Sequence, residues 1–263
     1  MADQQRKWAL VTGATGGLGR AFAQGLARRG YSLVLSARGA DALEVLAGEI
    51  RSAHGVEVVT QTADLGEPGA AQTLKSAIDS SGIAIETLIN NAGFAVHGRF
   101  ADQVADRVTG MVDVNIRALT ELTHLYAGDM ASRGGGHILL VASTGAFQPI
   151  PGYAVYAASK AYVLSFGRAL HQELRRRKVT VTVLCPGPTA TGFFIAAGHR
   201  INALTAAAIM QPEPVADIGL KALYAGKRDV VAGLMNRLTA FSTRLLPTAW
   251  LVMGAGYFMG NRK

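Results

Sequence analysis

A glycine-rich turn between a short apolar strand and a helix places the strongest constraint on how this chain folds. The run Trp8 to Thr12 is typical of a buried strand, and Thr12-Gly13-Ala14-Thr15-Gly16-Gly17-Leu18-Gly19 leads into a helical stretch that reaches Arg29. Gly13 permits a tight turn, Gly17 lets the backbone approach a ligand, and Gly19 lets the helix pack close to the strand. The first N–H groups of a helix are unpaired and lie at its positive dipole end, which suits a pyrophosphate. The segment therefore predicts a dinucleotide-binding strand–turn–helix unit.

The rest of the chain alternates short β-branched runs with longer helical ones. Strands are predicted at residues 8–12, 31–36, 56–60, 87–90, 137–141 and 179–184, and further helices at 41–53, 70–80, 107–132 and 153–177. Apolar strands separated by helices indicate a parallel sheet with both faces covered. Because no linker or internal repeat interrupts the 263 residues, we expect one α/β domain with a three-layer, Rossmann-type, doubly wound parallel sheet.

The end of the second predicted strand indicates which dinucleotide is bound. Dinucleotide folds usually hold the ribose 2′-hydroxyl with an acidic residue about 20 positions after the glycine turn. Here the strand ends Ser36-Ala37-Arg38 without an acid, and the planar guanidinium of Arg38 suits a 2′-phosphate. This pattern favours NADP(H) over NAD(H), with an exposed loop arginine that binds no ligand as the alternative.

A tyrosine and a lysine four residues apart predict a proton-transfer site. Tyr156-Ala-Ala-Ser-Lys160 puts a phenol and an ammonium on one helix face, about 6 Å apart along the axis, although such a pair alone is usually a surface contact. A free tyrosine titrates near pH 10, and a neighbouring ammonium favours the phenolate and lowers that pKa. Ser143 follows the fifth predicted strand, at the carboxyl edge where parallel α/β sheets bind ligands.

Together, these segments resemble the short-chain dehydrogenase/reductase family across essentially the whole chain. The matching features, in order, are the Thr-Gly-x-x-x-Gly-x-Gly turn, Asn90-Asn91-Ala92-Gly93, Ser143 with Tyr156-x-x-x-Lys160, and Pro186-Gly187. The resemblance implies a sheet of about seven strands. It also implies that Tyr156 is the general acid/base, that Lys160 lowers its pKa and binds the nicotinamide ribose, and that Ser143 orients the substrate carbonyl. Asn115 matches the helix asparagine that completes a proton relay.

The same resemblance implies a set of cofactor contacts spread along the chain. Asp64 and Leu65 match the adenine-contacting position after the third strand, and Thr189 matches a residue that contacts the carboxamide. Gly16 stands where many NADP-binding members carry a base, so the NADP preference depends on Arg38 alone. The complete predicted cofactor set is Gly13, Thr15, Gly16, Gly17, Leu18, Gly19, Arg38, Asp64, Leu65, Asn91, Ala92, Gly93, Tyr156, Lys160, Pro186, Gly187 and Thr189.

The segment 190–211 is where the family places its substrate lid, and here it is strongly apolar. Phe193 and Phe194 in the lid, and Phe147 between Ser143 and Tyr156, are the candidate substrate contacts. Packing of these rings onto the domain is an equally good account. If they line the site, the substrate is a moderately hydrophobic ketone or the corresponding alcohol. A 3-oxoacyl thioester would use the same residues, and a cofactor-binding regulator with weak turnover is the non-enzyme alternative.

The excess of basic residues is concentrated toward the C-terminal end. The chain carries a net charge of +8, and residues 198–263 hold 8 bases against 3 acids. We divide the chain into a domain at 1–234 and an apolar, basic extension at 235–263. The uncharged stretch between Arg244 and Arg262 contains one proline and three glycines, and it falls short of the ~20 apolar residues of a spanning helix. We expect the extension to pack on a subunit or to touch a membrane surface.

Composition narrows the remaining possibilities. The single cysteine, Cys185, excludes an internal disulfide, and the absence of a His/Cys/Asp cluster at ligand spacing predicts no metal site. The sequence shows no cluster of basic and aromatic residues of the kind that binds nucleic acid, so we expect no nucleic-acid partner. The polar N-terminal residues do not resemble a secretory signal. We therefore expect a cytoplasmic protein, membrane-associated at most through its C-terminal extension, and a homodimer or homotetramer of the kind usual in the family.

Overall fold

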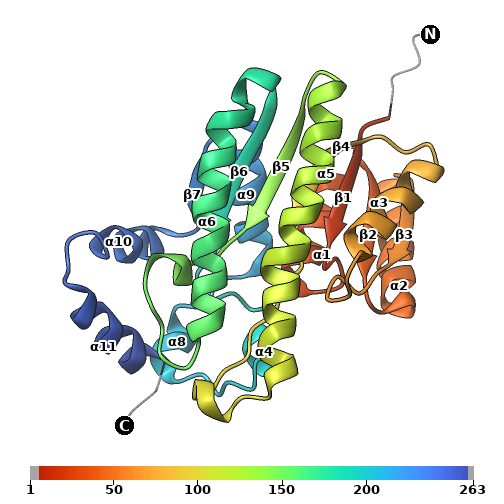
Figure 1. The fold of residues 1–263 in the computed structure, drawn as a ribbon. Coiled ribbons are helices and arrows are strands. Elements are labelled where there is room, and N and C mark those ends of the chain that lie inside the picture. Colours follow the sequence, from red (N-terminus) through yellow and green to blue (C-terminus); the bar gives the residue numbers. More distant parts are fainter. Residues whose placement is uncertain (1–5, 260–263) are drawn as a thin grey trace.

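A seven-stranded parallel sheet forms the centre of the molecule (Figure 1). The computed structural model describes residues 6–259, except for the side chain of Leu204. The strand order is β3-β2-β1-β4-β5-β6-β7, with every neighbouring pair parallel, which confirms the predicted doubly wound architecture. The strands are β1 (Trp8–Thr12), β2 (Ser32–Ala37), β3 (Val58–Thr62), β4 (Ile85–Asn90), β5 (Gly136–Val141), β6 (Val179–Cys185) and β7 (Asp229–Val231).

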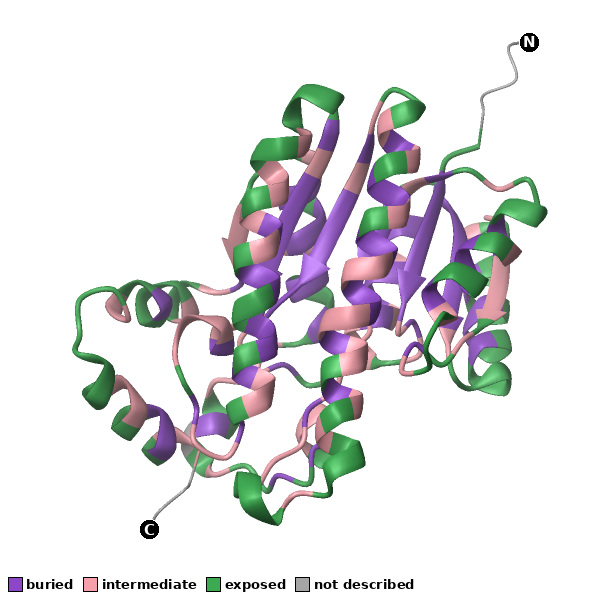
Figure 2. Ribbon diagram, in the orientation of Figure 1, coloured by how far each residue is buried: buried purple, intermediate pink, exposed green. Residues whose placement is uncertain are grey.

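Helices cover both faces of this sheet and create two separate apolar cores. One core lies beneath α1 (Gly17–Ala27), α2 (Ala40–His54) and α9 (Pro212–Tyr224). The other lies beneath α3 (Ala70–Ser80), α5 (Leu119–Ser132) and α6 (Ala154–Leu174). Figure 2 shows the central strands buried along most of their length, whereas the helices are buried only on their inner sides. This is the pattern expected of strands covered on both faces.

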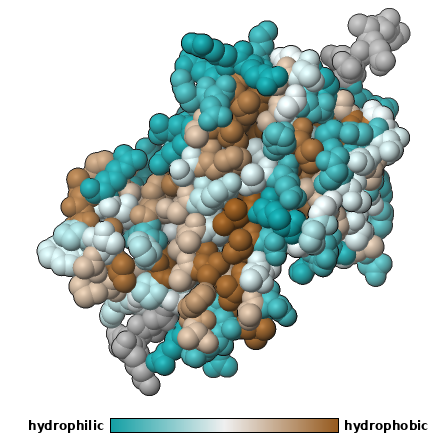
Figure 3. All heavy atoms as spheres, viewed as in Figure 1, coloured by the Kyte–Doolittle hydropathy of each residue, from teal (hydrophilic) through white to brown (hydrophobic). Residues whose placement is uncertain are grey.

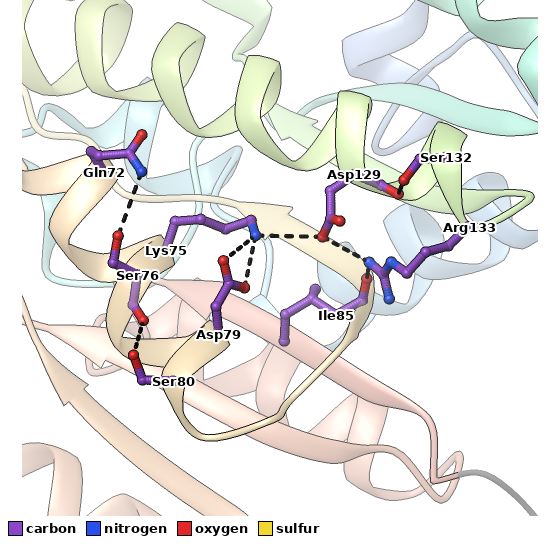
Figure 4. Close-up of polar contacts among 9 residues, drawn as sticks. All are labelled: Gln72, Lys75, Ser76, Asp79, Ser80, Ile85, Asp129, Ser132 and Arg133. Atoms are coloured by element: carbon purple, nitrogen blue, oxygen red, sulfur yellow. Dashed lines mark hydrogen bonds and ion pairs between the residues drawn. The ribbon is translucent and has the colours of Figure 1, made fainter.

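Figure 4 shows ion pairs that join α3 to α5 at the edge of the second core. The ammonium of Lys75 lies 2.6 Å from Asp79 on its own helix and 3.5 Å from Asp129 on α5. Arg133 lies 3.1 Å from the same Asp129 carboxylate and donates a 2.8 Å hydrogen bond to the carbonyl of Ile85. The network therefore ties two helices and the start of β4 together on the side of the sheet away from the ligand-binding edge.

The long helix predicted at residues 107–132 is interrupted in the structure. It consists of α4 (Ala105–Val112), a π-helical turn η2 (Asp113–Ala118) and α5. A π-turn carries one extra residue in the helical backbone, and such turns frequently occur at functional sites. The predicted helix at 153–177 is α6, followed by a 3₁₀ turn η4 at Arg175–Arg177. Two further 3₁₀ turns, η1 (Phe100–Asp102) and η3 (Thr144–Phe147), follow β4 and β5.

The outer surfaces of α5 and α6 carry apolar side chains that the sheet does not cover. Leu119, Leu122 and Val163 are buried against the sheet, whereas Leu125 and Phe166 are only partly buried. In Figure 3 a hydrophobic band runs through the middle of the face that these two helices present in Figure 1. Leu125 and Phe166 therefore pack at the margin of the second core and stay partly open to solvent.

The segment after β7 forms two helices at the ligand-binding end of the molecule. They are α10 (Leu234–Ser242) and α11 (Thr248–Phe258), and α11 lies near the short lid helices α7 (Phe193–Ala196) and α8 (Ala203–Ala207) (Figure 1). Within residues 6–259, none of the helices combines the length and the apolar character that crossing a bilayer needs. Nine large apolar side chains of this segment are exposed, namely Leu234, Met235, Leu238, Phe241, Leu245, Leu246, Trp250, Met253 and Tyr257.

Candidate active site

The glycine turn after β1 has the close contacts that its sequence predicts. Gly13 adopts a left-handed conformation, with φ of 62°. A Cβ atom on Gly19 would lie 2.1 Å from the carbonyl oxygen of Gly13, so only glycine fits where α1 begins. A Cβ atom on Gly17 would lie 2.9 Å from the Cα of Thr191, because the lid segment crosses this glycine. The turn therefore leaves the N-terminal N–H groups of α1 beside an open space.

A threonine at the end of β1 holds the second cofactor segment in place. The hydroxyl oxygen of Thr12 accepts hydrogen bonds from the N–H groups of Asn91 and Ala92, each at 3.0 Å. The side-chain amide of Asn91 donates to the Thr12 carbonyl at 2.9 Å. In the sequence Thr12 is recognisable only as the first residue of the turn motif. Its position at the end of a buried strand, next to a glycine, is the signal that could have identified this role.

These segments surround a cavity of about 840 Å³ at the carboxyl edge of the sheet. Its two ends differ in chemistry: one has the glycine turn and Arg38, and the other has Tyr156 and the lid. Every residue of the predicted cofactor set lines it, namely Gly13, Thr15, Gly16, Gly17, Leu18, Gly19, Arg38, Asp64, Leu65, Asn91, Ala92, Gly93, Tyr156, Lys160, Pro186, Gly187 and Thr189. The set therefore comes from the ends of five strands, β1, β2, β3, β4 and β6, and from the helix α6.

The polar groups at the first end fit a phosphorylated nucleotide. Arg38 is exposed and forms no ion pair or side-chain hydrogen bond with any residue that the structure describes. The buried hydroxyl of Ser36, which also lines the cavity, has no hydrogen-bond partner among the described residues. Asp64 accepts a 2.9 Å hydrogen bond from the N–H of Gly66, which fixes the loop after β3. A glycine cradle, an unpaired hydroxyl and an unpaired cation together match a dinucleotide phosphate.

Tyr156 and Lys160 lie side by side at the other end of the cavity. The ammonium of Lys160 is 5.7 Å from the centre of the Tyr156 ring and donates a 2.9 Å hydrogen bond to the carbonyl of Val141. Burial raises the pKa of Tyr156 to about 12, and hydrogen bonding with the Ser143 hydroxyl partly offsets that rise. Burial lowers the pKa of Lys160 to about 8, while the nearby Cys185 acts in the opposite direction. At neutral pH the phenol therefore keeps its proton, and the lysine is largely protonated.

Asn115 lies behind these groups and does not line the cavity. The π-turn η2 directs its side chain to the loop after β4, where its oxygen accepts from the N–H of Phe94 at 3.1 Å. Its amide nitrogen donates to the Phe94 carbonyl at 3.0 Å and to the hydroxyl of Ser159 at 3.1 Å. Ser159 in turn donates to the Tyr156 carbonyl at 2.7 Å. Asn115 thus links the cofactor-side loop to the helix that carries the tyrosine and lysine.

The candidate substrate contacts divide into two groups. Phe193 and Phe194 line the cavity, and the Phe193 ring centre is 5.2 Å from that of Tyr156. Phe147 does not line it, which agrees with the alternative that its ring packs onto the domain. Its ring packs against the core beneath α6, and the guanidinium of Arg168 lies 5.8 Å from the ring centre. The structure adds Met259, which our sequence reasoning assigned to an extension outside the site.

The cavity contains no arrangement that suggests a metal centre. Among residues 6–259, no group of three His, Cys, Asp or Glu side chains is placed to hold a metal ion. Cys185 is buried, and burial together with Asp229 raises the pKa of its thiol, so the thiolate is disfavoured. The titratable side chains that line this end are those of Tyr153, Tyr156 and Lys160, and the Ser143 hydroxyl lies within hydrogen-bonding reach of Tyr156.

Comparison with known proteins agrees with this geometry. The sequence model of the short chain dehydrogenase family matches residues 7–201. The very-long-chain 3-oxoacyl-CoA reductase-B of Danio rerio is 34% identical over 189 residues, which are 70% of this chain. That match covers 60% of the Danio rerio protein, so the matched part of the chain spans only about three fifths of the relative's length.

Two solved structures share the fold over almost the whole chain. A short-chain dehydrogenase from Sphingobium yanoikuyae in complex with NADPH is 31% identical, with a TM-score of 0.81 and coverage of 91% of this chain and 93% of that one. A short chain dehydrogenase/reductase from Burkholderia phymatum in complex with NAD is 26% identical, with a TM-score of 0.80 and coverage of 92% and 94%. Proteins with this fold therefore bind either dinucleotide, and the fold alone does not select one.

Proposed function

Because the chain belongs to the short-chain dehydrogenase family, we propose that it is an NADP(H)-dependent oxidoreductase that interconverts a ketone and a secondary alcohol. The observation that carries this proposal is the layout of the cavity. A phosphate-binding glycine turn with a free arginine lies at one end, and a buried tyrosine, serine and lysine lie at the other. The apolar lid residues Phe193 and Phe194 support a moderately hydrophobic substrate.

The side chains at the catalytic end divide the work of carbonyl reduction. The nicotinamide of bound NADPH supplies the hydride when the cofactor is present. Ser143 donates a hydrogen bond that holds the carbonyl oxygen, and Tyr156, protonated at neutral pH, gives its proton to that oxygen as negative charge develops there. The ammonium of Lys160 stabilises the phenolate that remains. Asn115 holds the loop after β4 in a fixed position relative to the helix α6.

Arg38 supports NADP(H) as the preferred cofactor. Its guanidinium lies at the cavity wall directly after β2, where a ribose-binding acid would favour NAD, and no described residue neutralises it. The 2′-phosphate of NADP would be an anionic partner for this cation.

A 3-oxoacyl thioester is the second candidate substrate. The specific observation in its favour is the similarity to the very-long-chain 3-oxoacyl-CoA reductase-B of Danio rerio. The same tyrosine and serine would act on the 3-oxo group, and the acyl chain would need an apolar channel beyond them.

We also propose that the outer face of α5 and α6 forms a homodimer or homotetramer interface. Tyr162 and Phe166 stack there with ring centres 5.5 Å apart, and the Tyr162 hydroxyl shares a 2.9 Å hydrogen bond with Thr120 of α5. A hydrophobic band also runs through the face of the molecule on which α5 and α6 lie (Figure 3). A location in the cytoplasm, or at a membrane surface through residues 235–263, stays a prediction.

The decisive experiment supplies ketones, aldehydes and 3-oxoacyl thioesters with NADPH or NADH and follows the nicotinamide absorbance. We expect reduction with NADPH, and we expect Tyr156→Phe to abolish it while NADPH still binds. Tyr31→Phe is the matched control, since it makes the same change at another buried tyrosine that does not line the cavity. Retention of reductase activity in Tyr156→Phe would disprove the proton-transfer role. A wild-type chain that binds NADPH but reduces none of these substrates would favour the regulatory alternative.

A further inference from the structure

The C-terminal helix α11 shares a small apolar core with the catalytic end of the cavity. This third core is separate from the two that flank the sheet, and it brings together residues from four distant parts of the chain. Partly buried side chains from the cavity wall pack against it. Its buried members are Ala95, Ile150, Tyr153, Ala157, Ala197 and Ala255, and the side chains packed on them are Tyr156, Phe193 and Met259. Met259 therefore lies at the tyrosine end of the cavity and not at the arginine end.

A histidine of the lid segment connects α11 to the helix that carries Tyr156. The Nε2 atom of His199 lies 3.1 Å from the Met259 carbonyl oxygen, which can only accept, so this nitrogen carries the proton. The Nδ1 atom then accepts a 2.8 Å hydrogen bond from the hydroxyl of Tyr153. The His199 ring also stacks on His97, with centres 4.1 Å apart and planes at 11°. His199 is only 7% exposed, so this is an interior junction of the lid, α6 and the end of α11.

Two more lid side chains bind the same end of α11. The last carbonyl groups of a helix have no partner within it and must be satisfied by other donors. Asn202 donates to the Phe258 carbonyl at 2.8 Å, and the Thr205 hydroxyl donates to the same oxygen at 3.1 Å. Together with His199, three donors of the lid segment cap the C-terminal turn of α11. The lid and α11 are therefore held together as one wall of the cavity.

We propose that Met259 is a specificity-determining residue that sets the depth of the substrate end of the cavity, with His199 as the positioning residue that holds it there. The inference rests on the proposed reduction of a carbonyl substrate. The side chains packed around Met259 are apolar or aromatic, among them Ile150, Tyr156 and Phe193, so the substrate class is a ketone whose chain beyond the carbonyl is apolar. A methionine side chain is flexible and polarisable, which suits a wall that contacts chains of several lengths.

The test measures binding across a series of methyl ketones from four to twelve carbons, with NADP⁺ present so that no turnover is needed. Each methylene buried in the cavity strengthens binding about fourfold, and the gain ends where the chain meets the wall. Replacing methionine by alanine removes three heavy atoms. We therefore expect Met259→Ala to extend the gain by about two carbons, and Met259→Trp to end it earlier. Met253→Ala is the matched control, because Met253 is on the same helix, is exposed and does not line the cavity.

The positioning role of His199 has its own readout. His199→Ala should release Met259 and let the gain continue to longer chains, as in Met259→Ala, while the affinity for NADPH stays near that of the wild type. His199→Gln keeps a donor for the Met259 carbonyl and should restore most of the wild-type chain-length profile.

The outcomes separate this inference from the proposed function. Chain-length profiles that are identical in the wild type and both Met259 variants overturn the inference, whether or not the protein reduces ketones. Normal ketone binding with altered profiles, but without reduction by NADPH, supports the wall and overturns the proposed reaction. A wild type whose ketone affinity does not depend on chain length overturns the inference as well.

Discussion

Replacing Asn115 by alanine tests how the π-turn connects the two halves of the site. The side chain is fully buried and makes three hydrogen bonds, two with the backbone of Phe94 and one with Ser159. Each such bond contributes about 1 kcal/mol net, and the partners left behind in a partly buried loop cannot be fully rehydrated. We therefore expect Asn115→Ala to lower the free energy of unfolding by about 3 kcal/mol. Ketone reduction should fall further than stability alone explains, because the loop that carries Gly93 loses its anchor.

The free energies of unfolding of Ser159→Ala and Asn115→Ala should differ in proportion to the hydrogen bonds that each removes. Ser159→Ala removes one of the three partners of Asn115 and also the bond from Ser159 to the Tyr156 carbonyl, so it should cost about 2 kcal/mol. Urea titrations followed by circular dichroism give both free energies, and NADPH oxidation with a fixed ketone gives the activities. If the free energy of unfolding of Asn115→Ala lies within about 1 kcal/mol of the wild-type value, or if Ser159→Ala lowers it as much as Asn115→Ala does, the hydrogen bonds of Asn115 do not hold the loop and the helix together.

Three further predictions concern the cofactor turn, the phosphate contact and the lid. Gly19→Ala should destabilise the protein by about 1–3 kcal/mol and abolish NADPH binding, because its Cβ would lie 2.1 Å from the Gly13 oxygen. Gly48→Ala, with open space around it in α2, should instead stabilise it by about 0.5–1 kcal/mol in the same denaturant titration. Arg38→Ala should raise the KM for NADPH roughly tenfold and leave the KM for NADH unchanged. This effect lies at the lower end of what a charge-assisted hydrogen bond contributes, because Arg38 is exposed. An equal change for both cofactors would exclude a 2′-phosphate contact. Burial, followed by the charge of His97, lowers the pKa of His199 from its ordinary value of 6.5. The neutral form of His199 therefore contributes its full stability above about pH 6.5, and this contribution is lost as the pH falls toward the lowered pKa. Between pH 7 and 5 the wild type should lose more unfolding free energy than His199→Gln, and parallel curves would contradict this.

The sheet could be predicted because its strands are short apolar runs between helical segments. All six predicted strands begin within two residues of those in the structure. The prediction for β3 is the one in which both ends are shifted by two residues. β3 is an edge strand whose residues after Val58 are half-buried or exposed, so its apolar pattern is weak. Pairing of Leu33 to Ala37 with Val58 to Thr62 sets its position, and this tertiary register is not contained in the local sequence.

The details that shape the site depend on contacts between residues far apart in the chain. The periodicity of residues 107–132 predicts an unbroken helix, and the π-turn has no local signal. It coincides with bonds from Asn115 to Phe94, which lies 21 positions earlier. Phe147 and Phe193 are both aromatic residues near the motif, yet only Phe193 reaches the cavity. Met259 could not be assigned to the site because its contact with the lid spans 60 positions.

The opposite effects of burial on Tyr156 and Lys160 predict how the reaction depends on pH and direction. The Tyr-x-x-x-Lys spacing predicts that the lysine lowers the pKa of Tyr156, but in this cavity burial is the larger influence and raises that pKa to about 12. Reduction needs the protonated phenol, which is present throughout the neutral range, whereas oxidation of an alcohol needs the phenolate. We therefore expect kcat/KM for ketone reduction to be nearly constant from pH 6 to 8.

Alcohol oxidation should instead increase from pH 7 and level off above about pH 8, where Lys160 loses the charge that stabilises the phenolate. Because Lys160, with a pKa of about 8, supplies the positive charge that stabilises the phenolate, Lys160→Met should weaken oxidation more than reduction at every pH. Lys178→Met, a change of the same kind at an exposed position, should alter neither profile. An oxidation rate that is already constant at pH 7 would show that the phenolate forms far more easily than its burial implies. The positive charge near Tyr156 would then lower the pKa of its phenol more than burial raises it.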